Sequence, residues 1–244
     1  MITMAAMPDG SPEIFTSIQG EGPSSGRLSV FARLSACNLY CRWCDTAYTW
    51  RWTDTHPHDD NVTFEREKWQ VRLDGGDLIR RIESRGPRRA IFTGGEPLIQ
   101  HRALLPVVRD LRRKGFDVEF ETNATVLPPP EFTDLASLIV ASPKLANAGI
   151  PEGDRIVPEV LRGLARLPQA AFKLVVTSEA DLAEARRLQM EFGIAHANVW
   201  IMPCGRSAED TTGIGRALIG EIMRLGYNYS ARLHLPLFGD AQGT

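Results

Sequence analysis

The sequence has no long apolar run and almost no net charge. No stretch approaches the roughly 18 consecutive apolar residues of a membrane span, and residues 1–15 lack the basic and apolar segments of a secretion signal. The 28 Lys and Arg residues nearly balance 30 Asp and Glu residues, which leaves a formal charge of −2. Such a balance creates no overall field toward nucleic acid or an anionic membrane. These absences predict a cytoplasmic protein that binds a small molecule, with no nucleic acid and no membrane as partner.

The 244-residue chain also has no internal repeat and no low-complexity linker long enough to divide it. Hydrophobic residues make up 43% and charged residues 24%, which excludes disorder, collagen and coiled coil as the main architecture. We therefore expect a single domain that spans residues 1–244.

Cysteine is scarce, and its distribution is uneven. Three of the four cysteines lie within eight residues, as Cys37-x3-Cys41-x2-Cys44. A reduced cytosolic chain of this size needs no disulfides, so the spacing indicates a metal or redox centre. A structural zinc site takes four protein ligands, and an ordinary electron-transfer cluster is held by four thiolates. Three thiolates on a 4Fe–4S cluster would leave one iron open to a substrate or cofactor.

A fourth ligand from elsewhere would instead make this a closed, non-enzymatic zinc or iron–sulfur module. His56 and His58 are the nearest histidines, although their Pro- and Asp-rich surroundings are typical of an exposed loop. Cys204 is another possible ligand. A lone cysteine is more often a buried apolar residue, so from its type alone we expect Cys204 to be structural.

Alternating strand-like and helical patterns predict the fold class. Apolar residues at helical spacing occur at 78–82, 104–111, 182–188 and 218–225, and the second of these helices should end at Gly115. Parallel βα units follow from this alternation, and fewer than eight strands implies an open or partial barrel. Residues 50–61 predict an irregular insertion and residues 128–130 a stiff turn. The six strand-like runs are Leu28–Leu34, Arg89–Thr93, Val118–Glu121, Leu138–Ala141, Phe172–Val176 and Val199–Met202.

Polar segments follow several of these runs, where a parallel sheet gathers its carboxyl ends. Residues 93–97, Thr-Gly-Gly-Glu-Pro, contain two glycines that permit close approach of backbone to a ligand. Residues 121–123, 142–144 and 202–205 end later runs. Each segment alone is consistent with an ordinary turn. Their recurrence at successive strand ends favours a shared pocket.

Two further features lie near the cysteines. Arg33, within the first run, could face solvent or could hold a carboxylate in a pocket through its planar guanidinium. Asp45 and Thr46 follow the third cysteine and offer two hard oxygen ligands, which suit Mg²⁺. The alternative for this pair is a turn that caps the cysteine loop.

The cysteine loop combined with residues 94–97, Gly-Gly-Glu-Pro, resembles the radical S-adenosylmethionine (SAM) superfamily, in which SAM chelates the open iron. Five segments over most of the chain further resemble the 7-carboxy-7-deazaguanine synthase (QueE) family. They are residues 15–22, 41–46, 93–97, 121–123 and 142–144.

This resemblance implies an α/β fold, a truncated TIM-like (βα)6 radical SAM barrel, that forms a homodimer. It implies three cofactors, namely a 4Fe–4S cluster, SAM and Mg²⁺. The implied reaction is a carbon–nitrogen lyase reaction of queuosine and 7-deazapurine biosynthesis. In it a radical ring contraction converts 6-carboxy-5,6,7,8-tetrahydropterin to 7-carboxy-7-deazaguanine with loss of ammonia. The implied partners are this pterin and an electron donor such as a flavodoxin.

The resemblance also implies roles for individual residues. Cys37, Cys41 and Cys44 would hold the cluster, and Thr46 would bind Mg²⁺. Arg33, Glu21 and Thr46 carry the expected catalytic roles. The residues expected to contact the pterin are Ile18, Gln19, Gly20, Arg33, Thr93, Glu121 and His234. The residues expected to line the SAM site are Trp43, Cys44, Asp45, Gly95, Ser142, Pro143, Lys144, Met202, Pro203, Cys204 and Gly205.

Two segments depart from the family pattern. The segment at 202–205 begins with Met202 where family members often have Gln, so a backbone group would have to replace any side-chain contact. Residues 232–239 match only in part, and a lone His234 is often structural. A rival within the same chemistry is an activating enzyme that makes a glycyl radical on a protein partner. If the protein were such an activating enzyme, Gln19, Glu21 and Arg33 would have no role.

Overall fold

A computed structural model of the chain describes residues 1–52 and 62–244. His56 and His58, the candidate fourth ligands of the alternative closed metal module, lie outside the described residues. The strands are β1 (Ile2–Ala5), β2 (Ile14–Ile18), β3 (Leu28–Leu34), β4 (Gln70–Leu73), β5 (Arg89–Gly94), β6 (Asp117–Thr122), β7 (Leu138–Ala141), β8 (Ala170–Val176), β9 (Val199–Pro203) and β10 (Asn228–Tyr229). The α-helices are α1 (Arg66–Trp69), α2 (Gly75–Glu83), α3 (His101–Arg113), α4 (Pro130–Thr133), α5 (Glu152–Arg155), α6 (Pro158–Ala165), α7 (Glu179–Phe192), α8 (Ala208–Arg224) and α9 (His234–Phe238). Short 3-10 turns are η1 (Gly22–Ser24), η2 (Ala47–Thr49), η3 (Pro97–Gln100), η4 (Ala146–Ala148) and η5 (His196–Asn198).

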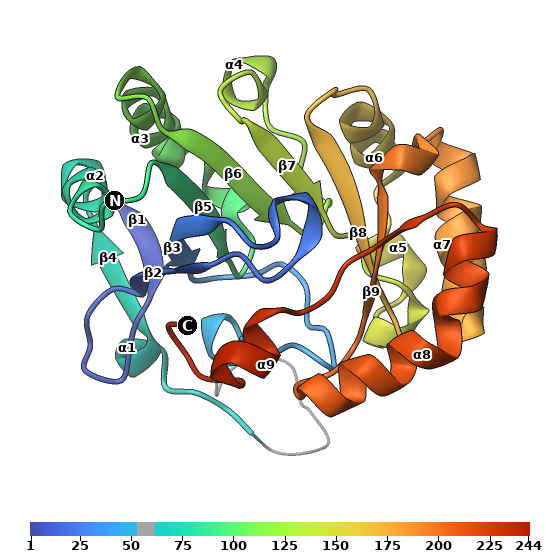
Figure 1. Cartoon of the computed structure of the whole chain (residues 1–244). Coiled ribbons are helices and arrows are strands. Elements are labelled where there is room, and N and C mark those ends of the chain that lie inside the picture. Colours follow the sequence, from blue (N-terminus) through green and yellow to red (C-terminus); the bar gives the residue numbers. More distant parts are fainter. Residues whose placement is uncertain (53–61) are drawn as a thin grey trace.

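The strands of the described residues form one sheet in the order β10-β9-β8-β7-β6-β5-β3-β1-β4, with β2 paired to β3 (Figure 1). Neighbours from β3 through β10 are parallel, whereas β1 and β2 pair antiparallel with their partners. No pairing joins β10 to β4 within the described ranges, so the sheet curves without closing. The expected partial barrel is confirmed.

All six expected strands are present, each within two residues of its expected bounds. The sequence pattern missed β1, β2, β4 and β10, because polar residues interrupt these short strands, whereas the equally short β7 is wholly apolar. The four expected helices are α2, α3, α7 and α8. Gly115 follows α3 with φ of +80°, which is the left-handed conformation expected at that end. The stiff turn at 128–130 was incompletely predicted, because Pro130 opens α4.

The helices α2, α3, α4, α6 and α7 lie along the outer side of the sheet (Figure 1). Side chains alternate between the two faces of each strand. In β6, Val118 and Phe120 are buried in the main core, while Glu119 and Glu121 point to the inner side. In β8, Phe172 and Leu174 join the same core and Lys173 faces inward. The inner face of the parallel strands therefore carries charge, and it forms the wall of a cavity.

No helix in the described part of the chain is long and apolar enough to cross a bilayer.

Candidate active site

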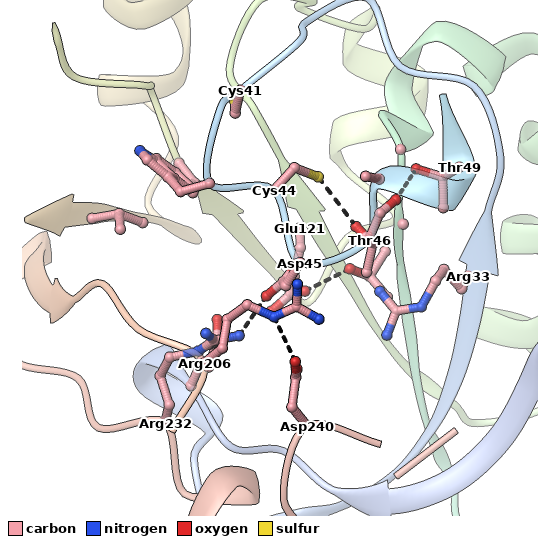
Figure 2. A pocket seen from close by; sticks show the side chains of 18 of the residues that line it. Arg33, Cys41, Cys44, Asp45, Thr46, Thr49, Glu121, Arg206, Arg232 and Asp240 are labelled. Carbon is pink, nitrogen blue, oxygen red and sulfur yellow. Dashed lines mark hydrogen bonds and ion pairs between the residues drawn. The ribbon is translucent and has the colours of Figure 1, made fainter. Parts of the chain in front are cut away.

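The inner face of the sheet and the cysteine loop enclose a cavity of about 800 Å³ (Figure 2). This is within the usual size range of cofactor and ligand sites, roughly 300–1,000 Å³. Segments from the whole chain contribute to its wall, from Phe15 to Thr244. The cavity lies at the carboxyl ends of the parallel strands, as expected for this architecture.

The Gly-Gly-Glu-Pro segment holds the start of the cysteine loop. Gly95 N donates to Leu34 O at 2.9 Å, and Glu96 N donates to Ala36 O at 2.8 Å. Ala36 itself has φ of +74°, a conformation that non-glycine residues rarely adopt. An added Cβ on Gly95 would lie 1.9 Å from Ala36 O, so only glycine permits this approach. The buried carboxylate of Glu96 accepts hydrogen bonds from Leu98 N and Asn123 N and thereby fixes the turn.

The three thiols of the loop face the cavity and are free of disulfides. Burial raises the pKa of Cys37 to about 12 and that of Cys41 to about 11, and it also raises the pKa of Cys44. Hydrogen bonds reach two sulfur atoms, from Leu39 N to Cys37 Sγ at 3.4 Å and from Trp50 Nε1 to Cys44 Sγ at 3.3 Å. Three soft donors on one loop fit an iron–sulfur cluster by their chemistry. No three His, Cys, Asp or Glu side chains of the described residues are packed as a closed metal site.

Asp45 and Thr46 differ in their availability as oxygen ligands. The Asp45 carboxylate lies 2.5 Å from Arg232 Nη2, so it is engaged in an ion pair (Figure 2). The Thr46 hydroxyl makes no cap bond to η2 and lies 3.7 Å from Cys44 Sγ. Asp45 and Thr46 stay predicted oxygen ligands, and the Asp45 carboxylate is already paired with Arg232. The Thr46 hydroxyl also contacts the cysteine loop, at Cys44 Sγ, as in the alternative of a turn that caps this loop.

A chain of charges crosses the inner wall beside the loop. Lys173 Nζ lies 2.5 Å from Glu21 Oε2 and 3.5 Å from Glu121 Oε1, and Arg232 Nε lies 2.9 Å from Glu21 Oε1. Burial alone raises the pKa of Glu21, but the positive charges of Lys173 and Arg232 hold it well below its ordinary value. Thr93 Oγ1 donates to Glu121 at 2.7 Å. The wall thus presents two carboxylates, Glu21 and Glu121, that form ion pairs with buried cations.

Arg33 faces the cavity rather than solvent. Its Nε lies 2.6 Å from Oε1 of the fully buried Glu13, which also accepts hydrogen bonds from Tyr48 and Gln242. Among the described residues, no hydrogen bond of the structure uses the two terminal amino groups of Arg33. They are positioned for a carboxylate, which a guanidinium binds in bidentate fashion.

Behind this wall lies a second buried carboxylate, that of Glu119. It accepts hydrogen bonds from Ser24 Oγ at 2.7 Å and Arg89 Nη1 at 3.2 Å. Burial and the negative charge of Glu121 outweigh these contacts and raise the pKa of Glu119 to about 7. Gln19 Nε2 reaches both carboxylates, at 3.5 Å from Glu119 and 3.2 Å from Glu121.

The structure brings together nearly all of the expected site residues. Pro143 is the exception, because it is buried away from the cavity wall. Cys204 is half-buried and lies on the cavity wall. His234 packs against Gly20, and burial lowers its pKa. The expected residues found on the wall are Ile18, Gln19, Gly20, Glu21, Arg33, Cys37, Cys41, Trp43, Cys44, Asp45, Thr46, Thr93, Gly95, Glu121, Ser142, Lys144, Met202, Pro203, Cys204, Gly205 and His234.

The sequence analysis missed Lys173, Arg232, Glu13 and Tyr48. For Lys173 a signal existed, because a single charge within the apolar strand Ala170–Val176 has to be paired if it is buried. Arg232 lies in the segment that matched the family only in part. Glu13 and Tyr48 gave no signal, because they reach the site through contacts across the fold.

Comparison with known proteins defines the class first. Residues 33–172, more than half of the chain, match the family described as Radical SAM superfamily. The chain belongs to this superfamily, whose members use a 4Fe–4S cluster and SAM.

Its relatives narrow the assignment. A 7-carboxy-7-deazaguanine synthase of Pyrobaculum aerophilum is 33% identical over 232 residues, which cover 95% of each chain. One of Halobacterium salinarum is 32% identical over 95% of this chain and 91% of its own. The crystal structure of QueE from Escherichia coli shares the fold, with a TM-score of 0.66, 24% identity and 95% coverage of both chains. The chain belongs to the 7-carboxy-7-deazaguanine synthase family.

Proposed function

We propose that this protein is a 7-carboxy-7-deazaguanine synthase, a radical SAM carbon–nitrogen lyase of queuosine and 7-deazapurine biosynthesis. Its substrate is 6-carboxy-5,6,7,8-tetrahydropterin, which undergoes ring contraction with loss of ammonia. One observation carries the proposal. The three-thiol loop, the unused amino groups of Arg33 and the carboxylates of Glu21 and Glu121 all face one cavity. Family membership over 95% of the chain supports the same activity.

The three cysteines would hold the cluster, which supplies the electron for reductive cleavage of SAM when both are bound. The chain itself positions the reactants. Arg33, fixed by Glu13, binds the substrate carboxylate through its terminal amino groups. Glu121 and Gln19 offer hydrogen-bond acceptors to the N–H groups of the pterin ring. The buried aromatic and apolar wall keeps water away from radical chemistry.

On the opposite side of the cavity, Trp43 and Lys144 are expected to line the SAM site. Lys144 Nζ lies 5.4 Å from the centre of the Trp43 ring, and Trp43 Nε1 donates to Asn147 Oδ1 at 3.1 Å. These contacts fix the indole next to Cys44 and give the aromatic residue of the loop one orientation. The Lys144 ammonium suits the carboxylate of SAM, and the fixed Trp43 ring suits its adenine.

The test of the activity is anaerobic reconstitution with iron and sulfide, followed by incubation with SAM, reductant and 6-carboxy-5,6,7,8-tetrahydropterin. The expected result is 7-carboxy-7-deazaguanine, identified by mass and ultraviolet spectrum. Cleavage of SAM without this product would overturn the substrate assignment.

The Mg²⁺ role of Thr46 has its own test. Thr46→Ala is expected to impair turnover and the response to added Mg²⁺ far more than the iron content. Equal loss of iron would count against the role, because Thr46 also lies near Cys44.

We also infer a homodimer, a flavodoxin-type electron donor and a cytoplasmic location. These inferences are supported by resemblance to the family and by composition. Light scattering of the purified protein tests the first, and turnover driven by reduced flavodoxin tests the second.

A further inference from the structure

Lys173 is a buried cation at the junction of two wall carboxylates. Only 7% of its side chain is exposed, and it projects from the middle of β8, whose other residues are all apolar and buried. Its ammonium reaches Glu21 Oε2 at 2.5 Å and Glu121 Oε1 at 3.5 Å. Glu21 comes from the connection between β2 and β3, whereas Glu121 comes from the end of β6. One side chain thus links two separate elements of the site.

The surroundings account for the charge of all three groups. Burial alone lowers the pKa of Lys173, but the charges of Glu121 and Glu21 more than offset this and raise it above its ordinary value. Arg232 is a second cation for Glu21, but it forms no ion pair with Glu121. The described residues give Glu121 no other cation within ion-pair distance, and its remaining partners are the neutral groups of Gln19 and Thr93. Lys173 is therefore the group on which the charge and placement of Glu121 depend most.

We propose that Lys173 is a positioning residue, which holds the carboxylates of Glu21 and Glu121 at a fixed spacing so that they accept hydrogen bonds from the substrate's N–H groups. This inference rests on the proposed function. The contact is present before any reaction, so it contributes equally to substrate and transition state. Uniform binding of this kind changes KM for the pterin more than kcat.

The test compares Lys173→Met with Lys173→Arg. For Lys173→Met, we expect the KM for the pterin to rise roughly 10- to 100-fold, as for loss of a charge-assisted hydrogen bond. The kcat and the KM for SAM should stay close to wild type. The Kd for the pterin, measured anaerobically by tryptophan fluorescence without SAM, should rise in parallel. Lys173→Arg keeps the positive charge and should recover most of the binding.

Lys114→Met is the matched control. Lys114 also bridges two carboxylates, Glu83 at 2.9 Å and Asp110 at 3.1 Å, but on the outer surface of the fold. Its kinetics should equal those of wild type. Substrate-independent cleavage of SAM and the iron content report whether each variant carries a working cluster.

Lys173→Met could also impair folding, because it leaves the half-buried Glu121 without a cation. The double variant Lys173→Met/Glu121→Gln removes the cation and the carboxylate charge together. It should unfold at a higher temperature than Lys173→Met, and its KM for the pterin should be no higher. A KM of the double variant that reflects additive effects of the two substitutions would overturn the proposal. So would a fall in kcat of Lys173→Met with unchanged KM. Failure of Lys173→Arg to recover pterin binding, while SAM cleavage is intact, would also overturn it. Failure of the wild type to convert the pterin would instead overturn the proposed function.

Discussion

Replacement of Gly95 by alanine tests the contact that positions the cysteine loop. The new Cβ would lie 1.9 Å from Ala36 O and 2.5 Å from Ala36 C, both backbone atoms. Real Cβ contacts are essentially never below 3.0 Å, so the loop must move by about 1 Å. That shift strains the packing, at about 1–3 kcal/mol. It also breaks the hydrogen bonds from Gly95 N to Leu34 O at the end of β3 and from Glu96 N to Ala36 O, at about 1 kcal/mol each. The expected loss in free energy of unfolding is about 3–5 kcal/mol.

Two measurements check this prediction for Gly95→Ala. Thermal unfolding should begin roughly 10–15 °C earlier, at about 3 °C per kcal/mol for a chain of this length. Iron bound after reconstitution should fall below that of wild type, because the displaced segment leads directly into Cys37. Gly220→Ala is the control, since a Cβ at this position of α8 meets no atom within 4 Å. It should stabilise the protein by up to about 1 kcal/mol. A Gly95→Ala protein with wild-type stability and iron content would refute the reasoning.

Three further predictions concern buried groups. The pKa of Glu119, about 7 against an ordinary 4.5, means that the folded state binds more protons than the unfolded state between these values. The wild type should therefore lose up to about 3 kcal/mol of stability as pH rises from 4.5 to 7, and Glu119→Gln should lack this loss in urea titrations. Glu13→Gln removes the charge opposite Arg33, so the KM for the pterin should rise roughly tenfold while that for SAM is unchanged. The Phe120 ring stacks on Phe92, with centroids 5.3 Å apart, and packs at a tilt against Phe132 at 4.9 Å. Phe120→Ala should reduce the free energy of unfolding by about 3–5 kcal/mol in urea. A Phe120→Ala loss below about 1 kcal/mol would contradict that packing.

Much of the fold was predictable, because parallel strands are long apolar runs with unambiguous patterns. The antiparallel strands β1 and β2 were not, since polar residues interrupt their short apolar patterns. They matter for the site because β2 leads into Gln19 and Glu21. The local sequence does not predict that this strand pairs with β3, and this pairing brings both residues to the inner face.

The candidate site was predictable where the residues lie in continuous motifs, as in the cysteine loop and residues 93–97. The partners of those residues were not. Arg33 could have faced solvent or the cavity on sequence evidence, and only the alternation within the folded sheet decides between them. The engagement of Asp45 by Arg232 depends on a contact between residues 187 positions apart, which no local pattern reports.

The same long separations set an order of assembly during synthesis. The thiol loop is translated well before Arg232 and Gln242, which also line the cavity. Gln242 bonds to Glu13 across 229 positions. Contacts between such distant residues are the last to become available to a growing chain. The loop is consequently translated long before the segments that complete its enclosure.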